Sequence, residues 1–151
     1  MKINKYQQQD IKEDYIDVHY RRLNPQITGL FEYLDAMNTV IGSKDHEQRV
    51  IHISEIYYCE IVERKCFAYL DQDVYELNYS LYDLLDTYHD NGLIRISKSM
   101  CVNVFKVIRM EADFNMRMKL YLKNGEIILL NRNYKNGFMK YLKQLTGRDE
   151  K

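Results

Sequence analysis

From Ile56 onward the sequence is a succession of short apolar segments separated by polar turns, and this pattern constrains the fold more than any other feature. Such punctuation is typical of strands joined by hairpins. The strongest turn signal is Lys123-Asn124-Gly125-Glu126, because Asn-Gly tolerates the positive φ angles of a type I′ turn. Fourteen tyrosines and a single proline also suit half-buried pleated sheet. We therefore expect a mainly β fold with short helices, of the α+β class.

The same pattern gives approximate positions for the elements. Strands are expected at 56–62, 65–70, 74–78, 102–110, 116–122 and 127–130. Residues 80–83 resemble a capping box with Asp83 in the usual place of Glu, which predicts a short helix that ends at Asn91-Gly92. A last helix is expected to carry Phe138, Tyr141, Leu142 and Leu145.

Residues 1–48 are expected to form an N-terminal strand–helix–strand segment. Apolar and polar side chains alternate over 15–22, which predicts a strand with one buried face, and a further strand, turn and strand are expected over 39–53. Asn24-Pro25 can open a helix between them. Its apolar stripe consists of Ile27, Leu30, Phe31, Leu34 and Met37. The stripe either packs internally or forms a dimer seam or a docking surface for a partner.

The charges cancel over the whole chain but not along it. The totals are 22 Lys and Arg against 22 Asp and Glu. By segment, the net charge is −2 over residues 1–56, −6 over 57–92 and +8 over 93–151. A basic surface of this size can attract DNA by releasing counterions, whereas the alternative reading is a solvated strand and helix face.

Other classes of function have no support in the sequence. Cys59, Cys66 and Cys101 form no C-x-x-C pair and are expected to be reduced core residues, and the histidine spacings predict no metal site. G-x-S-x-G, P-loop and H-E-x-x-H motifs are missing, so we expect neither an enzyme nor a cofactor nor a small-molecule substrate. Without a membrane-length apolar run or a signal-peptide core, a cytoplasmic protein is expected.

Three segments carry a family resemblance. They are Ile53-Ser-Glu-Ile-Tyr-Tyr-Cys-Glu60, then Leu93-Ile-Arg-Ile-Ser-Lys-Ser-Met-Cys-Val-Asn103, and finally Leu122-Lys-Asn-Gly-Glu-Ile-Ile-Leu-Leu-Asn-Arg-Asn-Tyr134. In this order and spacing the chain resembles the LytTR family of bacterial DNA-binding domains, and such a domain is expected over 49–147. The resemblance implies an elongated antiparallel β fold whose loops, rather than a recognition helix, enter successive major grooves.

The resemblance also implies which residues contact DNA. Base-contacting positions of the family correspond to Arg64, with Lys65 as its neighbour, to Lys98 and to Arg132. Ser97 and Asn131 stand where the family often has His and Ser, and both can still hydrogen-bond bases or phosphates. Lys135 is expected at a phosphate. Without the resemblance, Arg64 and Lys98 read as solvated turn residues, and Arg132 as an ion-pair partner of Glu126 or Asp113.

The protein so implied is a transcriptional regulator that reads promoter DNA. About 50 residues precede the match, too few for a phosphoacceptor receiver domain, so a stand-alone regulator is expected. The partners that the resemblance implies are double-stranded DNA, a second copy of the chain on paired sites, and a small membrane protein that restrains the regulator. The alternative is a protein-interaction or ligand-sensing module that kept the fold without promoter binding.

Overall fold

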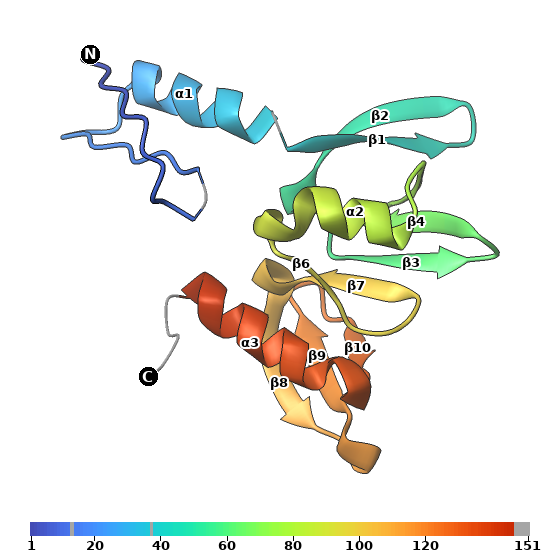
Figure 1. The fold of residues 1–151 in the computed structure, drawn as a ribbon. Coiled ribbons are helices and arrows are strands. Elements are labelled where there is room, and N and C mark those ends of the chain that lie inside the picture. Colours follow the sequence, from blue (N-terminus) through green and yellow to red (C-terminus); the bar gives the residue numbers. More distant parts are fainter. Residues whose placement is uncertain (13, 37, 147–151) are drawn as a thin grey trace.

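Two antiparallel sheets and three α-helices make up the computed structural model, which describes residues 1–12, 14–36 and 38–146 (Figure 1). The helices are α1 (Pro25–Ala36), α2 (Leu81–Tyr88) and α3 (Lys135–Thr146). The strands are β1 (Thr39–Lys44), β2 (Glu47–His52), β3 (Tyr58–Val62), β4 (Lys65–Tyr69), β5 (Val74–Leu77), β6 (Leu93–Arg95), β7 (Met100–Asn103), β8 (Val107–Ala112), β9 (Met118–Leu122) and β10 (Ile127–Leu130). The mainly β fold with short helices is confirmed.

The larger sheet has seven strands in the order β2-β1-β5-β4-β3-β7-β6, and every neighbouring pair is antiparallel. Helix α2 covers one face, where Leu81, Leu84 and Tyr88 join the first of two hydrophobic cores. The helix begins as its capping signal predicts, because the Ser80 hydroxyl accepts a hydrogen bond of 3.0 Å from the Asp83 N–H.

The smaller sheet has the order β10-β9-β8 and packs with α3 around a second core. Strands β3 and β7 lie between the two cores, so successive residues are buried on opposite faces. Cys59 and Cys101 face the α2 side, whereas Tyr58 and Val102 face the smaller sheet. The centre of the large sheet is therefore covered on both sides, as the two layers of Figure 1 show.

The chain passes from one sheet to the other at Asn103. This side chain is only 1% exposed, donates to the Ile56 carbonyl at 3.0 Å and accepts from the Phe105 N–H at 3.1 Å. These bonds turn the backbone into a 3₁₀ turn at Val104–Lys106. The single strand expected over 102–110 is therefore wrong: the segment is the end of β7, this turn and the start of β8.

The hairpin between β9 and β10 is also built differently from the expectation. Gly125 has a φ of 89°, but Asn124 does not have the positive φ that a type I′ turn requires. Instead the Gly125 N–H bonds the Leu122 carbonyl at 3.0 Å, and the Leu122 N–H bonds the Glu126 carbonyl at 2.9 Å. This is a three-residue loop in which the glycine occupies the left-handed position after the turn.

The N-terminal segment contains the expected helix but not its first strand. Residues 15–22 form no strand, because they pair with no neighbouring strand and lie instead near α1, where the Tyr20 and Phe31 rings meet edge to face at 5.9 Å. Ile27 is buried and Leu34 is half-buried, so the apolar stripe is partly covered. Met37 and residue 147, the expected end of the domain, lie outside the described residues.

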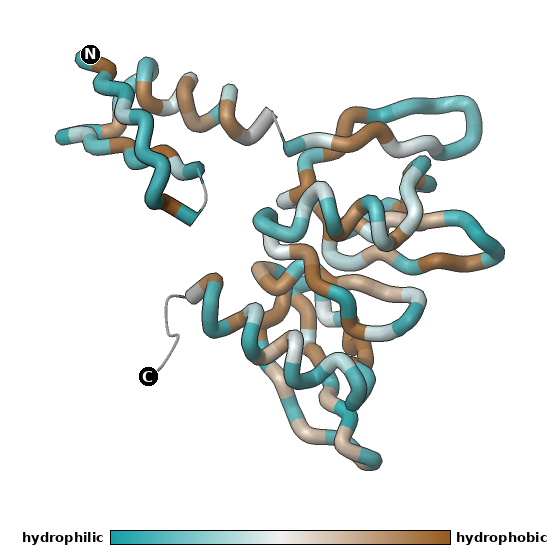
Figure 2. The backbone as a smooth tube through the Cα atoms, viewed as in Figure 1, coloured by the Kyte–Doolittle hydropathy of each residue, from teal (hydrophilic) through white to brown (hydrophobic). Residues whose placement is uncertain are grey.

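Hydropathy follows this architecture. Apolar stretches of the tube lie inside the two layers, whereas the turns of β1–β2 and β3–β4 at the sheet margin are polar (Figure 2). Cys59, Cys66 and Cys101 are free and buried, as expected of core residues. Among the described helices, none is long and apolar enough to span a membrane.

Candidate nucleic-acid interface

Arg64 lies at the tip of the hairpin between β3 and β4. Val62 pairs with Lys65, which leaves Glu63 and Arg64 as a two-residue loop with φ angles of 50° and 69°. Both angles are positive, as in a type I′ turn, although neither residue is glycine or asparagine. The backbone is thus held in a left-handed conformation that costs free energy, while Arg64 and Lys65 are exposed to solvent.

Lys98 lies in the loop that joins β6 to β7. The Arg95 guanidinium donates to the Lys98 carbonyl at 2.6 Å, and the Ser99 N–H donates to the Ser97 hydroxyl at 3.3 Å. The side chains of Ser97 and Arg95 therefore stabilise the conformation of the loop by hydrogen bonds to its backbone. The Lys98 side chain is exposed and has no side-chain partner among the described residues.

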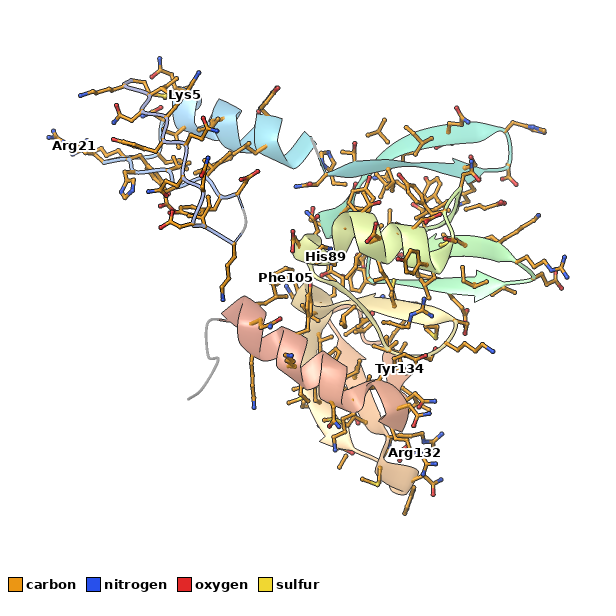
Figure 3. The ribbon with its side chains drawn as sticks, in the orientation of Figure 1. Lys5, Arg21, His89, Phe105, Arg132 and Tyr134 are labelled. Carbon is orange, nitrogen blue, oxygen red and sulfur yellow. The ribbon has the colours of Figure 1, made fainter. Side chains whose placement is uncertain are left out.

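Arg132 lies between β10 and α3. The Asn131 side chain accepts from the Asn133 N–H at 2.9 Å, and this bond caps the 3₁₀ turn that leads to Lys135 at the start of α3. The Asn131 side chain is thus bonded to the backbone of its own loop, whereas the Arg132 side chain is not. Figure 3 shows Arg132 at the lower end of the molecule, projecting away from the sheets.

The ion pairs that could have neutralised Arg132 are not formed. The Glu126 carboxylate instead accepts from the Tyr58 hydroxyl at 2.7 Å and from the Asn124 amide at 3.1 Å. Asp113 pairs with Arg117 at 3.2 Å. The Arg132 guanidinium therefore remains available to a ligand.

Backbone hydrogen bonds connect the three loops to one another. The Ile61 N–H, next to the β3–β4 turn, bonds the Ser99 carbonyl at 2.8 Å. At the other end of the Lys98 loop, the Asn131 N–H bonds the Ile96 carbonyl at 2.9 Å. The strand before Arg64, the Lys98 loop and the residue before Arg132 are therefore joined in series, which fixes the spacing of the three cations.

The basic side chains of the domain differ in whether a carboxylate neutralises them. Arg49, Arg109 and Arg117 form ion pairs with neighbouring carboxylates. The side chains of Arg64, Lys65, Lys98, Arg132 and Lys135 have no partner in the part of the chain that the structure describes. The side chains of Lys123 and Lys140 are likewise exposed and have no partner in the described residues, so what distinguishes the family positions is that their loops are joined by backbone hydrogen bonds.

Two tyrosine hydroxyls connect elements that lie far apart in the chain. Tyr58 of β3 reaches Glu126 beside β10, and burial followed by this hydrogen bond raises the pKa of the Tyr58 hydroxyl. The Tyr141 hydroxyl of α3 donates to the His89 carbonyl and accepts from the Gly92 N–H at 3.1 Å. Sequence reasoning missed these contacts because their partners lie far apart in the chain.

The model of the "LytTr DNA-binding domain" family matches residues 46–143, which is more than half of the chain.

The chain belongs to the LytTR family.

A solved LytTr DNA-binding domain from Bacillus cereus superimposes with a TM-score of 0.66 at 22% identity, over 70% of this chain and 96% of the other, which shows the shared fold.

Curated relatives extend the similarity beyond the domain. An "uncharacterized HTH-type transcriptional regulator" of Staphylococcus aureus (strain bovine RF122 / ET3-1) is 28% identical, and the proteins of that description from strains NCTC 8325 and COL are 26% identical. Each match covers 89% of this chain and 92% of the relative. Residues 46–151 alone are too few to make up that share, so the matched region also includes part of the segment before residue 46.

The name of these relatives refers to a helix-turn-helix, but the LytTR domain of this chain has a different architecture. In the described residues, strands separate α1 from α2 and α2 from α3, so no two α-helices follow each other across a short turn. The described residues therefore contain no helix-turn-helix of α-helices.

Proposed function

We propose that this protein is a transcriptional regulator that recognises a specific promoter sequence through the loops that carry Arg64, Lys98 and Arg132. The observation that carries the proposal is that these three cations lack protein partners while their loops are hydrogen-bonded in series. Arg and Lys can both donate to guanine O6 and N7 in the major groove. A fixed spacing between the loops is what simultaneous reading of separate groove positions requires.

The neighbouring residues fit supporting roles. Lys65 and Lys135 are placed beside the reading side chains and suit phosphate contacts, which set the register without reading sequence. Ser97 and Asn131 support their loops and have remaining hydrogen-bonding capacity for DNA. Residues 49–147 are the proposed DNA-binding unit. The names of the curated relatives support a role in transcription.

Three further parts of the proposal rest on the family resemblance. A pair of promoter sites would be occupied by two copies of the chain, a small membrane protein would restrain the regulator, and the regulator would act in the bacterial cytoplasm. None of these parts requires catalysis or a small-molecule substrate.

The proposal is tested by selecting binding sites from random duplexes with the full chain, then measuring Kd for the selected and a scrambled site. Arg132→Ala is compared with Lys140→Ala, because Lys140 is an exposed cation of α3 outside the three loops. Loss of a base-reading contact should reduce the specificity ratio by about tenfold or more. Lys140→Ala should weaken both duplexes alike.

Two results would contradict the proposal. One is that the wild-type chain enriches no sequence at low salt, and the other is that Arg132→Ala weakens selected and scrambled duplexes equally. Either would favour the alternative of an interaction or sensing module that has kept the LytTR fold.

A further inference from the structure

The turn between β8 and β9 exposes two large apolar side chains. Phe114 is 83% exposed, the highest value for a large apolar side chain in the described residues, and Met116 is 69% exposed. Neither residue takes part in the hydrophobic cores or in the three loops described above. Two large apolar side chains gathered in water on one turn can serve as a contact surface.

The turn is held rigidly. The Asp113 N–H bonds the Arg117 carbonyl at 2.9 Å, and the Arg117 guanidinium pairs with the Asp113 carboxylate at 3.2 Å. Between them, Asn115 and Met116 have φ angles of 60° and 64°, a left-handed conformation that asparagine tolerates but that is costly for methionine. Phe114 and Met116 are thus presented by a closed, strained turn whose charges neutralise each other.

The turn lies at the same end of the smaller sheet as the loop that carries Arg132. Met118 of β9 pairs with Leu130 of β10, so the residues just before Met118 lie at the same end of the sheet as those just after Leu130. The Phe114–Met116 turn is therefore a neighbour of Arg132. Figure 3 shows Arg132 beside this lower end of the sheet.

We propose that Phe114 and Met116 form an apolar wedge that enters the minor groove next to the major-groove segment read by Arg132 and partly unstacks a base step. The inference rests on the proposed function. Phe and Met are among the side chains that can open base steps and kink a duplex. Because Arg117 neutralises Asp113, no unpaired carboxylate of the turn opposes the phosphates.

The experiment uses the full chain, a selected duplex with 2-aminopurine placed at successive steps beside the Arg132 contact, and a circular-permutation assay of bending. Phe114→Ala and Met116→Ala are compared with Phe105→Ala, an exposed phenylalanine away from Arg132 in Figure 3. All variants are first checked by circular dichroism and thermal melting. The wild type should raise 2-aminopurine fluorescence at one step and bend the duplex.

Phe114→Ala should lose that signal, reduce the bend and weaken binding by about tenfold, the size of one lost base–aromatic stack. A mismatch at the same step should restore most of the affinity. Phe105→Ala should behave like the wild type.

Wild-type affinity and bending in Phe114→Ala would overturn the wedge while leaving the proposed function intact. A change in self-association without DNA would also overturn it, by assigning the turn to a contact between copies. If the wild type selects no sequence at all, the proposed function itself fails.

Discussion

At the scale of single residues, the β3–β4 turn contains two residues that lower the stability of the fold but place a cation at an exposed tip. Glu63 and Arg64 both adopt the left-handed conformation, which Asn-Gly would adopt at lower cost. A turn selected for stability alone would not place a long cation there. Backbone strain of this kind is often retained at functional sites, so the left-handed turn is consistent with a binding role for Arg64.

This reading predicts opposite effects from one double substitution. Replacing Glu63-Arg64 by Asn-Gly (E63N/R64G) should raise the free energy of unfolding by about 1 kcal/mol, because the left-handed cost is relieved. The same variant should bind the selected duplex more weakly, because Arg64 is lost. Urea denaturation and a binding titration measure the two effects. E63N alone is the control: it should gain part of the stability and keep the affinity, and equal affinity in all three proteins would contradict the role of Arg64.

Gly42 in β1 shows how closely the large sheet is packed. A Cβ at this position would lie 2.8 Å from the Cβ of Tyr75 and would also meet the Ile51 side chain. Because β1 is hydrogen-bonded to strands on both sides, Gly42→Ala should lower the free energy of unfolding by about 1–3 kcal/mol. Gly29→Ala is the control, since a Cβ there meets nothing within 4 Å and alanine favours the α1 helix. Urea midpoints that shifted alike for both variants would contradict the packing argument.

At the scale of elements, the sequence predicted strands well where one face is buried and poorly where the environment changes along the segment. Residues 39–53, 65–70 and 127–130 have clear partners and form strands as expected. Residues 102–110 cross between sheets at Asn103, and residues 15–22 alternate in polarity but have no neighbouring strand. Local pattern cannot reveal either fact, because both depend on which elements meet in space.

The free energy that the contact between the two sheets contributes can be measured by substituting Tyr58. Tyr58→Phe removes the 2.7 Å hydrogen bond to Glu126, and because this carboxylate is exposed and can bind water instead, the cost should be about 1 kcal/mol. Tyr69→Phe is the control, since its bond to Glu60 is 3.4 Å long. Chemical denaturation at pH 7 should show the larger loss for Tyr58→Phe, and equal losses would count against a specific sheet-to-sheet contact.

The pKa of Tyr58 predicts a pH dependence for the same variant. Burial and the bond to Glu126 raise this pKa above the unfolded value of about 10, so the folded state holds the proton more tightly. The stabilisation is complete below pH 10 and is lost as the pH rises further. Between pH 9 and pH 11, the free energy of unfolding should therefore fall more steeply in the wild type than in Tyr58→Phe. Parallel curves would show that the hydroxyl is not held as described.

At the scale of the whole molecule, the candidate site could be named from the sequence only in part. Motif order was enough to point to Arg64, Lys98 and Arg132, but it could not show that their side chains lack partners or that their loops are hydrogen-bonded in series. Nor did any motif mark Phe114, which the β9–β10 register places at the same end of the smaller sheet as Arg132. Motifs identify single residues, whereas hydrogen bonds between segments far apart in the chain bring those residues onto one surface.

The segregation of charge gives the last prediction. The net charge is zero, yet the basic third contains Lys98, Arg132 and Lys135, three of the five cations of the candidate interface, so the binding constant should fall steeply with salt. Lys135→Ala should make the slope of log K against log salt shallower by about 0.9, one phosphate contact. Lys44→Ala is the control, because Lys44 pairs with Asp73 at 3.0 Å and should leave the slope unchanged. Titrations from 50 to 200 mM salt compare the three proteins. A slope near zero in the wild type would mean that the charges do not act together on a phosphate backbone.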